Sequence, residues 1–280
     1  MNAEIGFDDL KRHYVSVAEG RAMSGLRLVL GAYAVPGPWR ESCKGLFYVK
    51  GLSYTPVRTA NEGASDLQVG MDGTQSELIA WTAQGSAPVA IWNDERPRSL
   101  WNDQLLLAER LAPEPALIPA AIEDRVRMFG LINEIAGENG IAWSKRLLMC
   151  HGPLQSLPAD DPGRAFWETL GTKYGYTKEA AVAASAHIVS ILNTLDRQLA
   201  SQQARGHRYM MGPALSALDI YWACFLALFK PMPPELCPMA TAYRGAYSND
   251  DPAIEQALTP ALCAHRDFVY EQHLELPIVF

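Results

Sequence analysis

The sequence predicts an α/β domain followed by an all-α domain. The first observation is length, since 280 residues exceed what one hydrophobic core usually organises. The second is a strand–helix–strand pattern near the start, and the third is a change to helical periodicity alone after a proline-rich stretch at 113–119. Hydrophobic residues make up 49% of the chain and charged residues 20%, a composition typical of globular proteins that excludes the disordered and fibrous classes.

The charge and the apolar runs restrict the partners of the protein. A net charge of −7 without a cluster of basic residues excludes a nucleic-acid surface, because phosphate neutralisation needs clustered lysine and arginine. Residues 1–9 have no cationic segment and no apolar core, so they predict no signal peptide. The longest apolar stretch, 220–229, is too short to cross a bilayer. We therefore expect a soluble, cytoplasmic protein with no nucleic-acid or membrane partner.

The five cysteines predict neither a disulfide framework nor a zinc site. Their number is odd, no two are spaced as Cys-x-x-Cys, and no Cys/His spacing suits zinc. We expect small, buried side chains in a reducing compartment, and no metal cofactor. The cysteines are Cys43, Cys150, Cys224, Cys237 and Cys263.

A βαβ unit follows an N-terminal extension of residues 1–25. The apolar run 26–33 is typical of a buried strand, and the prolines after it end that strand. Apolar spacing then predicts a helix over 39–50, and Gly51 is placed to end this helix in the left-handed conformation. Residues 54–57 predict the second strand, which completes a βαβ unit within about thirty residues.

The remainder of the α/β domain contains shorter signals. Polar residues at 59–74 predict an insertion, and 77–82 predicts a short helix. Residues 87–92 predict a strand that begins at a proline, with 98–101 as a plausible partner strand. Asp103 is a strong N-cap residue, and we expect it to begin an apolar helix with free backbone N–H groups.

A linker at 113–120 is the clearest boundary in the chain, because three of its residues are prolines. We therefore place the α/β domain at 26–112 and the all-α domain at 121–280. Within the second domain, helical periodicity is strongest over 182–199, and a last helix is expected over 259–273 with a proline in its first turn.

A capping motif opens one of the predicted helices of the second domain. Ser216 can cap this helix, and Asp219 can return a hydrogen bond to the Ser216 backbone N–H, which makes a capping box. The residues that follow are apolar nearly all round, so the helix is expected to be buried and must satisfy its own terminal amides. With Gly212 four residues before the serine, the block resembles the N-capping segment of the buried helix in glutathione transferases.

The resemblance implies a thioredoxin-like first domain that binds glutathione as a co-substrate. Ala87-Pro88 resembles the segment in which the proline is cis and the preceding backbone holds the cysteinyl part of glutathione. Asp103 and Gln104 match the acid-and-hydroxyl pair that opens the next helix, although glutamine replaces the usual serine. A helix N-terminus and a side-chain amide can still bind the γ-glutamyl carboxylate. Trp39 is a further candidate contact with glutathione.

The group that activates the glutathione thiol is less evident. In the family a tyrosine, serine or cysteine lowers the thiol pKa by one hydrogen bond near the end of the first strand. Residues 37–39 carry neither a hydroxyl nor a thiol. Tyr33 is the candidate of the tyrosine type, or else a strand residue packed beneath the first helix. Arg40 is the next candidate, because a guanidinium favours an anion. Cys43 is expected to be core.

The acceptor-substrate site is expected along the first helices of the second domain. Glu134 and Glu138 are spaced i, i+4, so on one helix they share a face, and Trp143 adds an aromatic wall. Either the two carboxylates face a cleft and imply a polar or cationic acceptor, or they face solvent, or they pair with Lys145 or Arg146.

The expected function is that of a glutathione transferase-like enzyme that adds the thiolate to an electrophilic small molecule, or uses it in dehalogenation, ether cleavage or isomerisation. The alternative is a non-catalytic ligand-binding or assembly module of the same fold. A glutathione-using reductase is disfavoured because no cysteine lies at 37–39. The resemblance also implies a homodimer.

Overall fold

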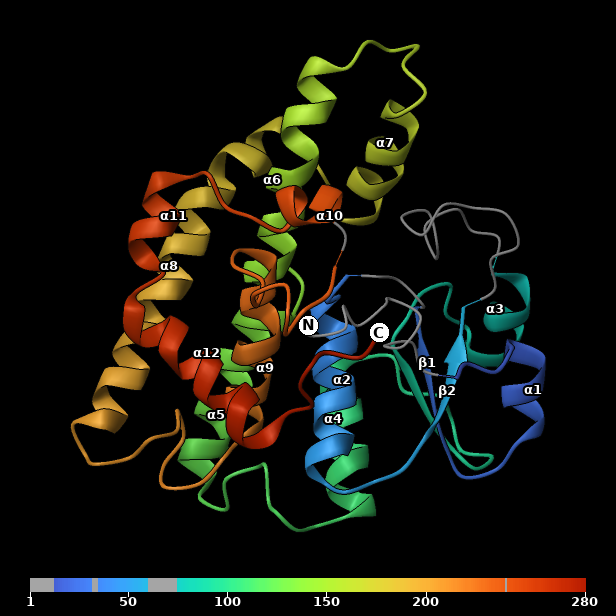
Figure 1. Cartoon of the computed structure of the whole chain (residues 1–280), viewed down its shortest axis with the longest axis vertical. Coiled ribbons are helices and arrows are strands. Elements are labelled where there is room, and N and C mark those ends of the chain that lie inside the picture. Colours follow the sequence, from blue (N-terminus) through green and yellow to red (C-terminus); the bar gives the residue numbers. More distant parts are fainter. Residues whose placement is uncertain (1–12, 32–34, 60–74, 240) are drawn as a thin grey trace, which may run out of the picture. The chain divides into compact units, whose positions relative to one another are not determined.

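The computed structural model describes residues 13–31, 35–59, 75–239 and 241–280. The chain divides into two compact units, and neither is contiguous in sequence. The first comprises 1–115, 231–245 and 270–280, and the second comprises 116–230 and 246–269 (Figure 1). This division differs from the bounds drawn from the sequence, which assign 231–245 and 270–280 to the all-α domain.

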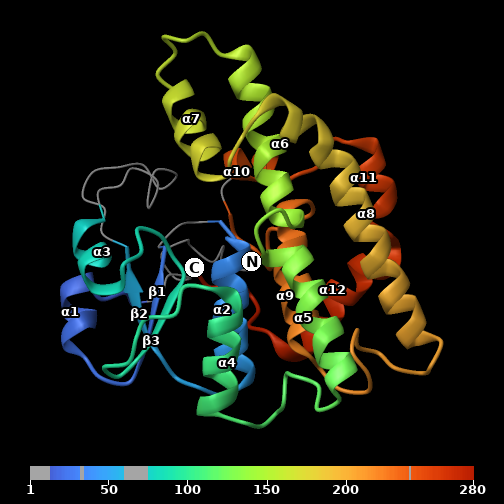
Figure 2. The ribbon, with the colours of Figure 1, turned by 180° about the vertical axis from the view of Figure 1, so that it is seen from behind.

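The first unit contains a three-stranded sheet in the order β2-β1-β3. Strand β1 (Leu26–Leu30) is buried throughout and pairs in parallel with β2 (Thr55–Arg58). Strand β3 (Val89–Trp92) lies antiparallel on the other side of β1 and is best seen in Figure 2. The predicted strand–helix–strand order is confirmed, because β1 and β2 flank a single helix.

Helices cover both faces of this sheet (Figure 1). On one face lie α1 (Val17–Ala22) and α3 (Ser76–Thr82), which bury an apolar cluster against the strands. On the other face α2 (Pro38–Val49) packs against α4 (Trp101–Leu111). The expected left-handed glycine is present, since Gly51 has φ +64° and ends α2. Such a mixed sheet between helix pairs matches a thioredoxin-like domain.

The predicted partner strand at 98–101 is wrong among the described residues. Arg98 forms one isolated bridge with Ala90, and α4 already begins at Trp101 with Leu100 as its N-cap. The Leu100 carbonyl accepts the first hydrogen bond of α4, from the Gln104 backbone N–H at 3.1 Å. The segment therefore turns into a helix before a ladder can extend. The expectation that Asp103 begins α4 is wrong as well, because Asp103 lies in the first turn.

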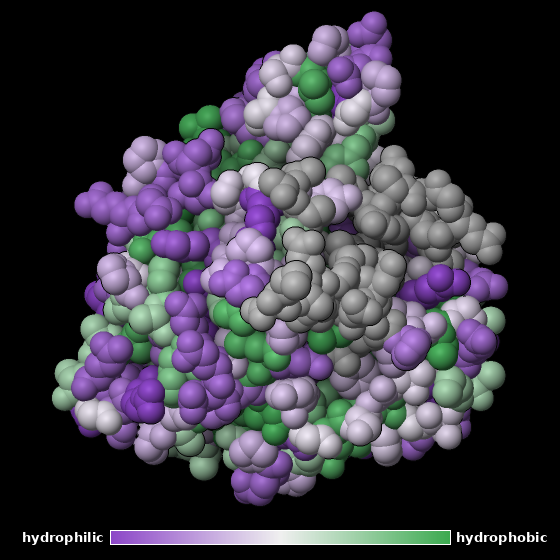
Figure 3. Space-filling view, in the orientation of Figure 1, coloured by the Kyte–Doolittle hydropathy of each residue, from purple (hydrophilic) through white to green (hydrophobic). Residues whose placement is uncertain are grey.

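Helices are the only extended elements among the described residues of the second unit, as predicted, and one isolated bridge joins Tyr209 and Gly212. Its helices pack mainly as α5 on α9, α6 on α7 and α8, and α11 on α8. Hydrophilic side chains gather over α8 and α11 on the face shown in Figure 3. The last predicted helix is confirmed, with a proline in its first turn. The elements after the linker are α5 (Ile122–Ala136), α6 (Ile141–Ser156), α7 (Arg164–Lys173), α8 (Lys178–Gln203), α9 (Ala217–Phe225) with a 3-10 turn (Leu226–Leu228), α10 (Thr241–Ala246), α11 (Pro252–Ala257) and α12 (Pro260–His273).

Helix α9 is the buried centre of the second unit, and all nine of its residues are buried. The predicted capping box is present, with the Ser216 backbone N–H donating to Asp219 Oδ2 at 2.8 Å. The other carboxylate oxygen, Oδ1, accepts from the Met210 backbone N–H and from the His265 ring, each at 2.8 Å. One side chain thus joins α9, the segment before it and α12.

The segments 231–245 and 270–280 pack within the first unit rather than the second. The Ile278 backbone N–H donates to the Leu236 carbonyl at 2.8 Å, which joins the two segments to each other. Lys44 Nζ on α2 donates to the Val279 carbonyl at 2.6 Å, and the Phe280 side chain is buried. The sequence carried no local signal of this packing, because it depends on residues more than two hundred positions apart.

No helix in the described part of the chain is long and apolar enough to cross a membrane. All five cysteines are free, and four of them are buried as expected, with Cys263 partly exposed.

Candidate functional site

One edge of the sheet brings together the candidate glutathione-binding segments of the first unit. The Ala87–Pro88 peptide bond is cis and directly precedes β3. The antiparallel register pairs Val29 with Val89, so the end of β1 lies beside the cis-proline. Arg40, in the first turn of α2, donates to the Gly31 carbonyl just after β1. The carboxyl end of β1 is therefore close both to the Pro88 segment and to the first turn of α2.

The N-terminus of α2 leaves its first backbone N–H groups without a side-chain cap. Gly37 is the N-cap residue and Pro38 occupies the first turn. A helix N-terminus without a side-chain acceptor attracts an anion, because the amide dipoles point outward. Trp39 is partly exposed here, and its carbonyl accepts from the Ser42 hydroxyl at 3.1 Å. Cys43 is fully buried, and burial raises the pKa of its thiol, which makes it core as predicted.

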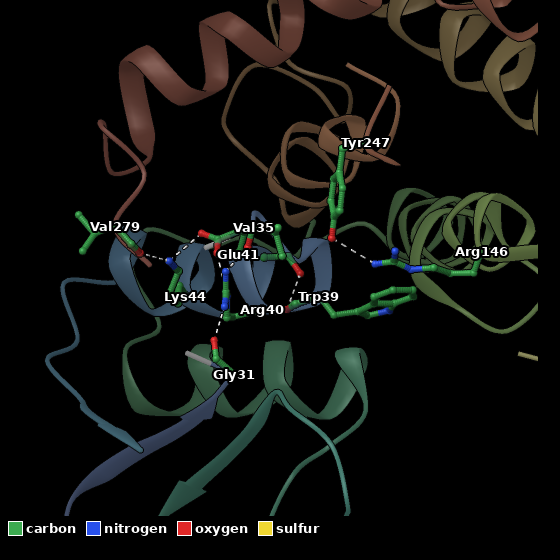
Figure 4. A network of polar contacts seen from close by, with 10 residues as sticks. Gly31, Val35, Trp39, Arg40, Glu41, Lys44, Arg146, Tyr247 and Val279 are labelled. Atoms are coloured by element: carbon green, nitrogen blue, oxygen red, sulfur yellow. Dashed lines mark hydrogen bonds and ion pairs between the residues drawn. The ribbon is translucent and has the colours of Figure 1, made fainter. Parts of the chain in front are cut away.

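Arg40 is 4% exposed and is engaged within the first unit. Its guanidinium donates to the carbonyls of Gly31 and Val35 and forms an ion pair with Glu41 at 3.0 Å (Figure 4). The Phe280 ring centroid lies 5.6 Å from the guanidinium carbon. Since the charge is already paired, Arg40 acts on the segment between β1 and α2 instead of presenting a free cation.

Glu41 is shared between two cations. Its carboxylate contacts Arg40 through Oε1 and Lys44 through Oε2, the latter at 2.7 Å. All three side chains are buried, so the ion pairs are desolvated and their geometry must be well satisfied. Tyr33, the candidate thiol-activating residue, lies outside the described residues.

The two candidate residues in the first turn of α4, Asp103 and Gln104, make different contacts. Gln104 is 2% exposed, and its amide Nε2 lies within hydrogen-bond distance of the carbonyls of Pro88, Arg98 and Ser99 at 3.2–3.3 Å. This amide supports the cis-proline segment from inside. Asp103 instead forms an ion pair with Arg96 at 3.1 Å, and its carboxylate keeps part of its surface in solvent.

The acceptor-site candidates of the second unit do not share one helix face. Helix α5 ends at Ala136, so Glu138 lies beyond it and the expected i, i+4 arrangement with Glu134 is wrong. Gly137 ends the helix because its backbone leaves the helical conformation there. Both carboxylates are exposed, and among the described residues neither forms an ion pair with Lys145 or with another cation.

Trp143 lies on α6 and contacts the end of α7. Its indole Nε1 donates to the Tyr174 carbonyl at 2.9 Å, and the two rings meet edge to face at 4.7 Å. The indole is partly exposed. Trp143 is therefore held in place by the helical unit while one side of it remains accessible.

Comparisons with known proteins bear on the fold. No family model matches the chain, and no curated protein matches it. A glutathione S-transferase of Xanthobacter autotrophicus matches with a TM-score of 0.53 at 16% identity, over 91% of this chain and 98% of that one. A glutathione S-transferase of Methylobacterium radiotolerans, in complex with glutathione sulfonate, has a TM-score of 0.56 at 13% identity over 89% and 92%. Rice GST1 in complex with glutathione has a TM-score of 0.54 at 17% identity over 91% and 93%.

The chain has the glutathione transferase fold. The agreement with solved structures extends over nearly the whole chain, so it includes the thioredoxin-like and the helical parts. The fold expected from the capping box and from Ala87-Pro88 is confirmed.

Within this glutathione transferase fold, sequence reasoning missed two contacts at the candidate site. Arg96 is the exposed ion-pair partner of Asp103, seven residues before it, and no pattern marks it. The internal role of Gln104 depends on three carbonyls that only folding brings together. Among the described residues no cluster of three or more histidine, cysteine or acidic side chains is arranged to hold a metal ion.

Proposed function

We propose that the chain binds glutathione at the sheet edge of its first unit and activates the thiol for attack on an electrophilic small molecule. The observation that carries the proposal is the uncapped N-terminus of α2 in the same unit as the Ala87-Pro88 segment, which begins β3 and is held by Gln104. The fold supports it, since rice GST1 was solved in complex with glutathione.

The proposed contacts follow from the chemistry of the tripeptide. Ala87 lies just before the β1–β3 ladder, which begins at Val89, and its backbone would bind the cysteinyl amide. Helix α4 has no side-chain cap at Leu100, so its first amides would bind the γ-glutamyl carboxylate. Asp103 would accept from the α-ammonium group, with Arg96 as the cation it exchanges. Trp39 would cover the bound peptide, and Gln104 would hold Pro88 in place.

Thiol activation requires a shift of the thiol pKa, because a free thiol with a pKa of about 8.5 is mostly protonated at neutral pH. The N-terminus of α2 would favour the thiolate, and the Tyr33 hydroxyl would donate a hydrogen bond to it. The sulfur then forms a bond to the electrophilic carbon while the leaving group departs with its electron pair. We assign Arg40 a positioning role, since it holds the carbonyls of Gly31 and Val35, which flank the 32–34 segment in sequence.

The decisive experiment measures binding and turnover on the full chain. We expect micromolar to millimolar binding of glutathione by calorimetry, and conjugation of a chlorodinitrobenzene. Tyr33→Phe should lower kcat/KM by about 10- to 100-fold with glutathione binding retained, because one hydrogen bond to the thiolate is lost. Tyr48→Phe, at an exposed tyrosine of α2, is the matched control and should leave turnover unchanged. Absence of binding at millimolar glutathione would refute the proposal.

A non-catalytic ligand-binding module of the same fold is the second candidate. The contacts of Arg40 and Gln104 favour this candidate. Both side chains donate to backbone carbonyls of the first unit, so these donors are not directed at a substrate. Tight glutathione binding without turnover of any electrophile would support this candidate. We further propose a homodimer by analogy with the fold, which light scattering tests directly; a monomer mass would contradict it.

A further inference from the structure

Arg146 on α6 has a guanidinium without an acidic partner among the described residues. Its Nη2 donates to the Tyr247 hydroxyl at 3.4 Å, which is a long contact, and its Nη1 donates to the Met149 sulfur at 3.3 Å, a weak acceptor. The guanidinium also forms a hydrogen bond with the Tyr174 side chain. Its Nε is buried and has no hydrogen-bond partner. A buried donor without an acceptor costs free energy, and no carboxylate of the described ranges compensates the Nε of this arginine.

Aromatic rings surround this guanidinium. The Tyr247 ring centroid lies 5.6 Å from the guanidinium carbon, and Figure 4 shows the Tyr247 hydroxyl directed at Arg146. Trp143, one turn earlier on α6, packs edge to face on Tyr174. Tyr174 and Tyr247 are buried, whereas Arg146 and Trp143 are partly exposed. The cluster therefore reaches the surface of the helical unit along one side.

The electrostatic surroundings favour an anion. Burial lowers the pKa of Arg146, but Tyr247 and Tyr174 outweigh it and hold the pKa above its ordinary value, so the side chain stays cationic. Lys145 precedes it, and the pKa of this buried lysine is lowered first by burial, with Arg146 adding to the effect. The Lys173 ammonium lies 6.0 Å from the Tyr174 ring centroid and adds positive charge.

We propose that Arg146 anchors a binding site for a small aromatic carboxylate. A guanidinium edge formed by Nε and one Nη matches the two oxygens of a carboxylate, which would satisfy the buried Nε. The ring of the ligand would lie against the indole of Trp143, and the Tyr247 hydroxyl would donate to the carboxylate. All of these residues belong to the second unit, and binding of the carboxylate is measured without glutathione, so it can fail or succeed separately from the proposed function.

A planar carboxylate fits better than phosphate. Within the described part of the cluster, one unpaired guanidinium faces aromatic rings, and Lys145 already donates to the Ser248 carbonyl at 2.8 Å and lies near Asp250. A phosphate would meet the guanidinium but would place no ring against the aromatic side chains. A monoanion that carries an aromatic ring matches both the guanidinium and the aromatic rings.

The rival explanation is a structural arginine that aromatic faces and phenol oxygens alone compensate. The two explanations differ in their response to a ligand. A ligand site binds para-iodobenzoate with Arg146 as its contact, whereas a structural arginine does not distinguish this acid from its neutral amide.

The test uses the full chain and two probes of equal size, para-iodobenzoate and para-iodobenzamide. Calorimetry should give at least tenfold tighter binding of the acid, and the iodine of a soaked crystal should lie over Trp143. Arg146→Gln should weaken binding of the acid at least tenfold, and Arg146→Lys should restore part of it. Arg197→Gln removes an exposed arginine of α8 and is the matched control, which should bind the acid as the wild type does.

Several outcomes overturn the proposal. If the acid and the amide bind equally well, the ligand's charge does not contribute to binding. If Arg146→Gln binds the acid with unchanged affinity, Arg146 does not contact the carboxylate. If inorganic phosphate displaces the acid at equal concentration, the site is a general anion site and the aromatic carboxylate is wrong. Should Arg146→Gln fail to fold, the acid-against-amide comparison on the wild type and the position of iodine still decide.

Discussion

Asp219→Ala should be the most destabilising single change in the capping motif of α9. The carboxylate is fully buried and accepts from four donors, which are the backbone N–H and hydroxyl of Ser216, the backbone N–H of Met210 and the ring of His265. Since a carboxylate only accepts, His265 Nε2 must carry the proton in this contact. Alanine would leave all four donors buried without a partner.

The magnitude follows from the cost of an unsatisfied buried donor, about 1–3 kcal/mol for each group. Even at the low end the loss is about 4 kcal/mol, which is a large share of the about 5–15 kcal/mol that stabilise a typical protein. Asp219→Asn keeps one acceptor oxygen, so about half of this loss is expected. Ser216→Ala removes only the hydroxyl of the cap and should cost about 1 kcal/mol.

Urea unfolding followed by far-ultraviolet circular dichroism measures these differences. The expected order of destabilisation is Asp219→Ala, then Asp219→Asn, then Ser216→Ala. Asp124→Asn makes the same change at an exposed position in the first turn of α5, and it should alter the free energy of unfolding by less than about 0.5 kcal/mol. The reasoning is refuted if Asp219→Ala costs no more than Ser216→Ala, because the buried carboxylate would then not satisfy the other donors.

Three further outcomes are expected. Gly20→Ala should lower the free energy of unfolding by about 1–3 kcal/mol, since the new Cβ would lie 2.5 Å from a valine methyl of β2. Gly130→Ala should raise the free energy of unfolding by about 0.5–1 kcal/mol, because nothing lies within 4 Å of its new Cβ. Urea unfolding of both variants measures the two effects. A hydrogen bond from the Ser185 hydroxyl is the main cause that holds the pKa of Asp251 below its ordinary value of 3.8. The ionised carboxylate therefore stabilises the fold fully above pH 3.8, and this contribution is lost as the pH falls through the lower pKa of the folded state. Asp251→Asn should flatten this part of the acid dependence of the urea midpoint. Iodoacetamide should modify Cys263 before the buried thiols of the native protein, and early modification of Cys43, found by mass spectrometry of peptides, would contradict the burial of α2.

The elements that could be predicted from the sequence are those with signals inside a few residues. The left-handed Gly51, the capping box of Ser216 and Asp219, and the proline that opens α12 each act within one helical turn, and all three are present. Where two local signals compete, prediction failed. Residues 98–101 were predicted as a strand, but α4 begins within them, because the Leu100 carbonyl accepts a helical hydrogen bond from the Gln104 backbone N–H.

The candidate site shows the same division at the level of side chains. The sequence placed Ala87-Pro88 before a strand, and a cis bond is found there. It could not place the long polar side chains, because their partners depend on chain packing. Arg40 is a cation near a helix start in the sequence, and in the fold its charge is paired with Glu41 and its donors hold two carbonyls. Gln104 likewise points inward to Pro88.

The sequence by itself determined the class of fold, the succession of most helices and strands, and the caps that stabilise α9, since periodicity and capping are properties of neighbouring residues. Only the tertiary structure decided which charges are paired. Arg146 meets Tyr247 across 101 positions of sequence, and Lys44 meets Val279 across 235. Contacts at such separations are set by how whole helices pack and not by local preference, and for that reason the aromatic surroundings of Arg146 became visible only in the folded chain.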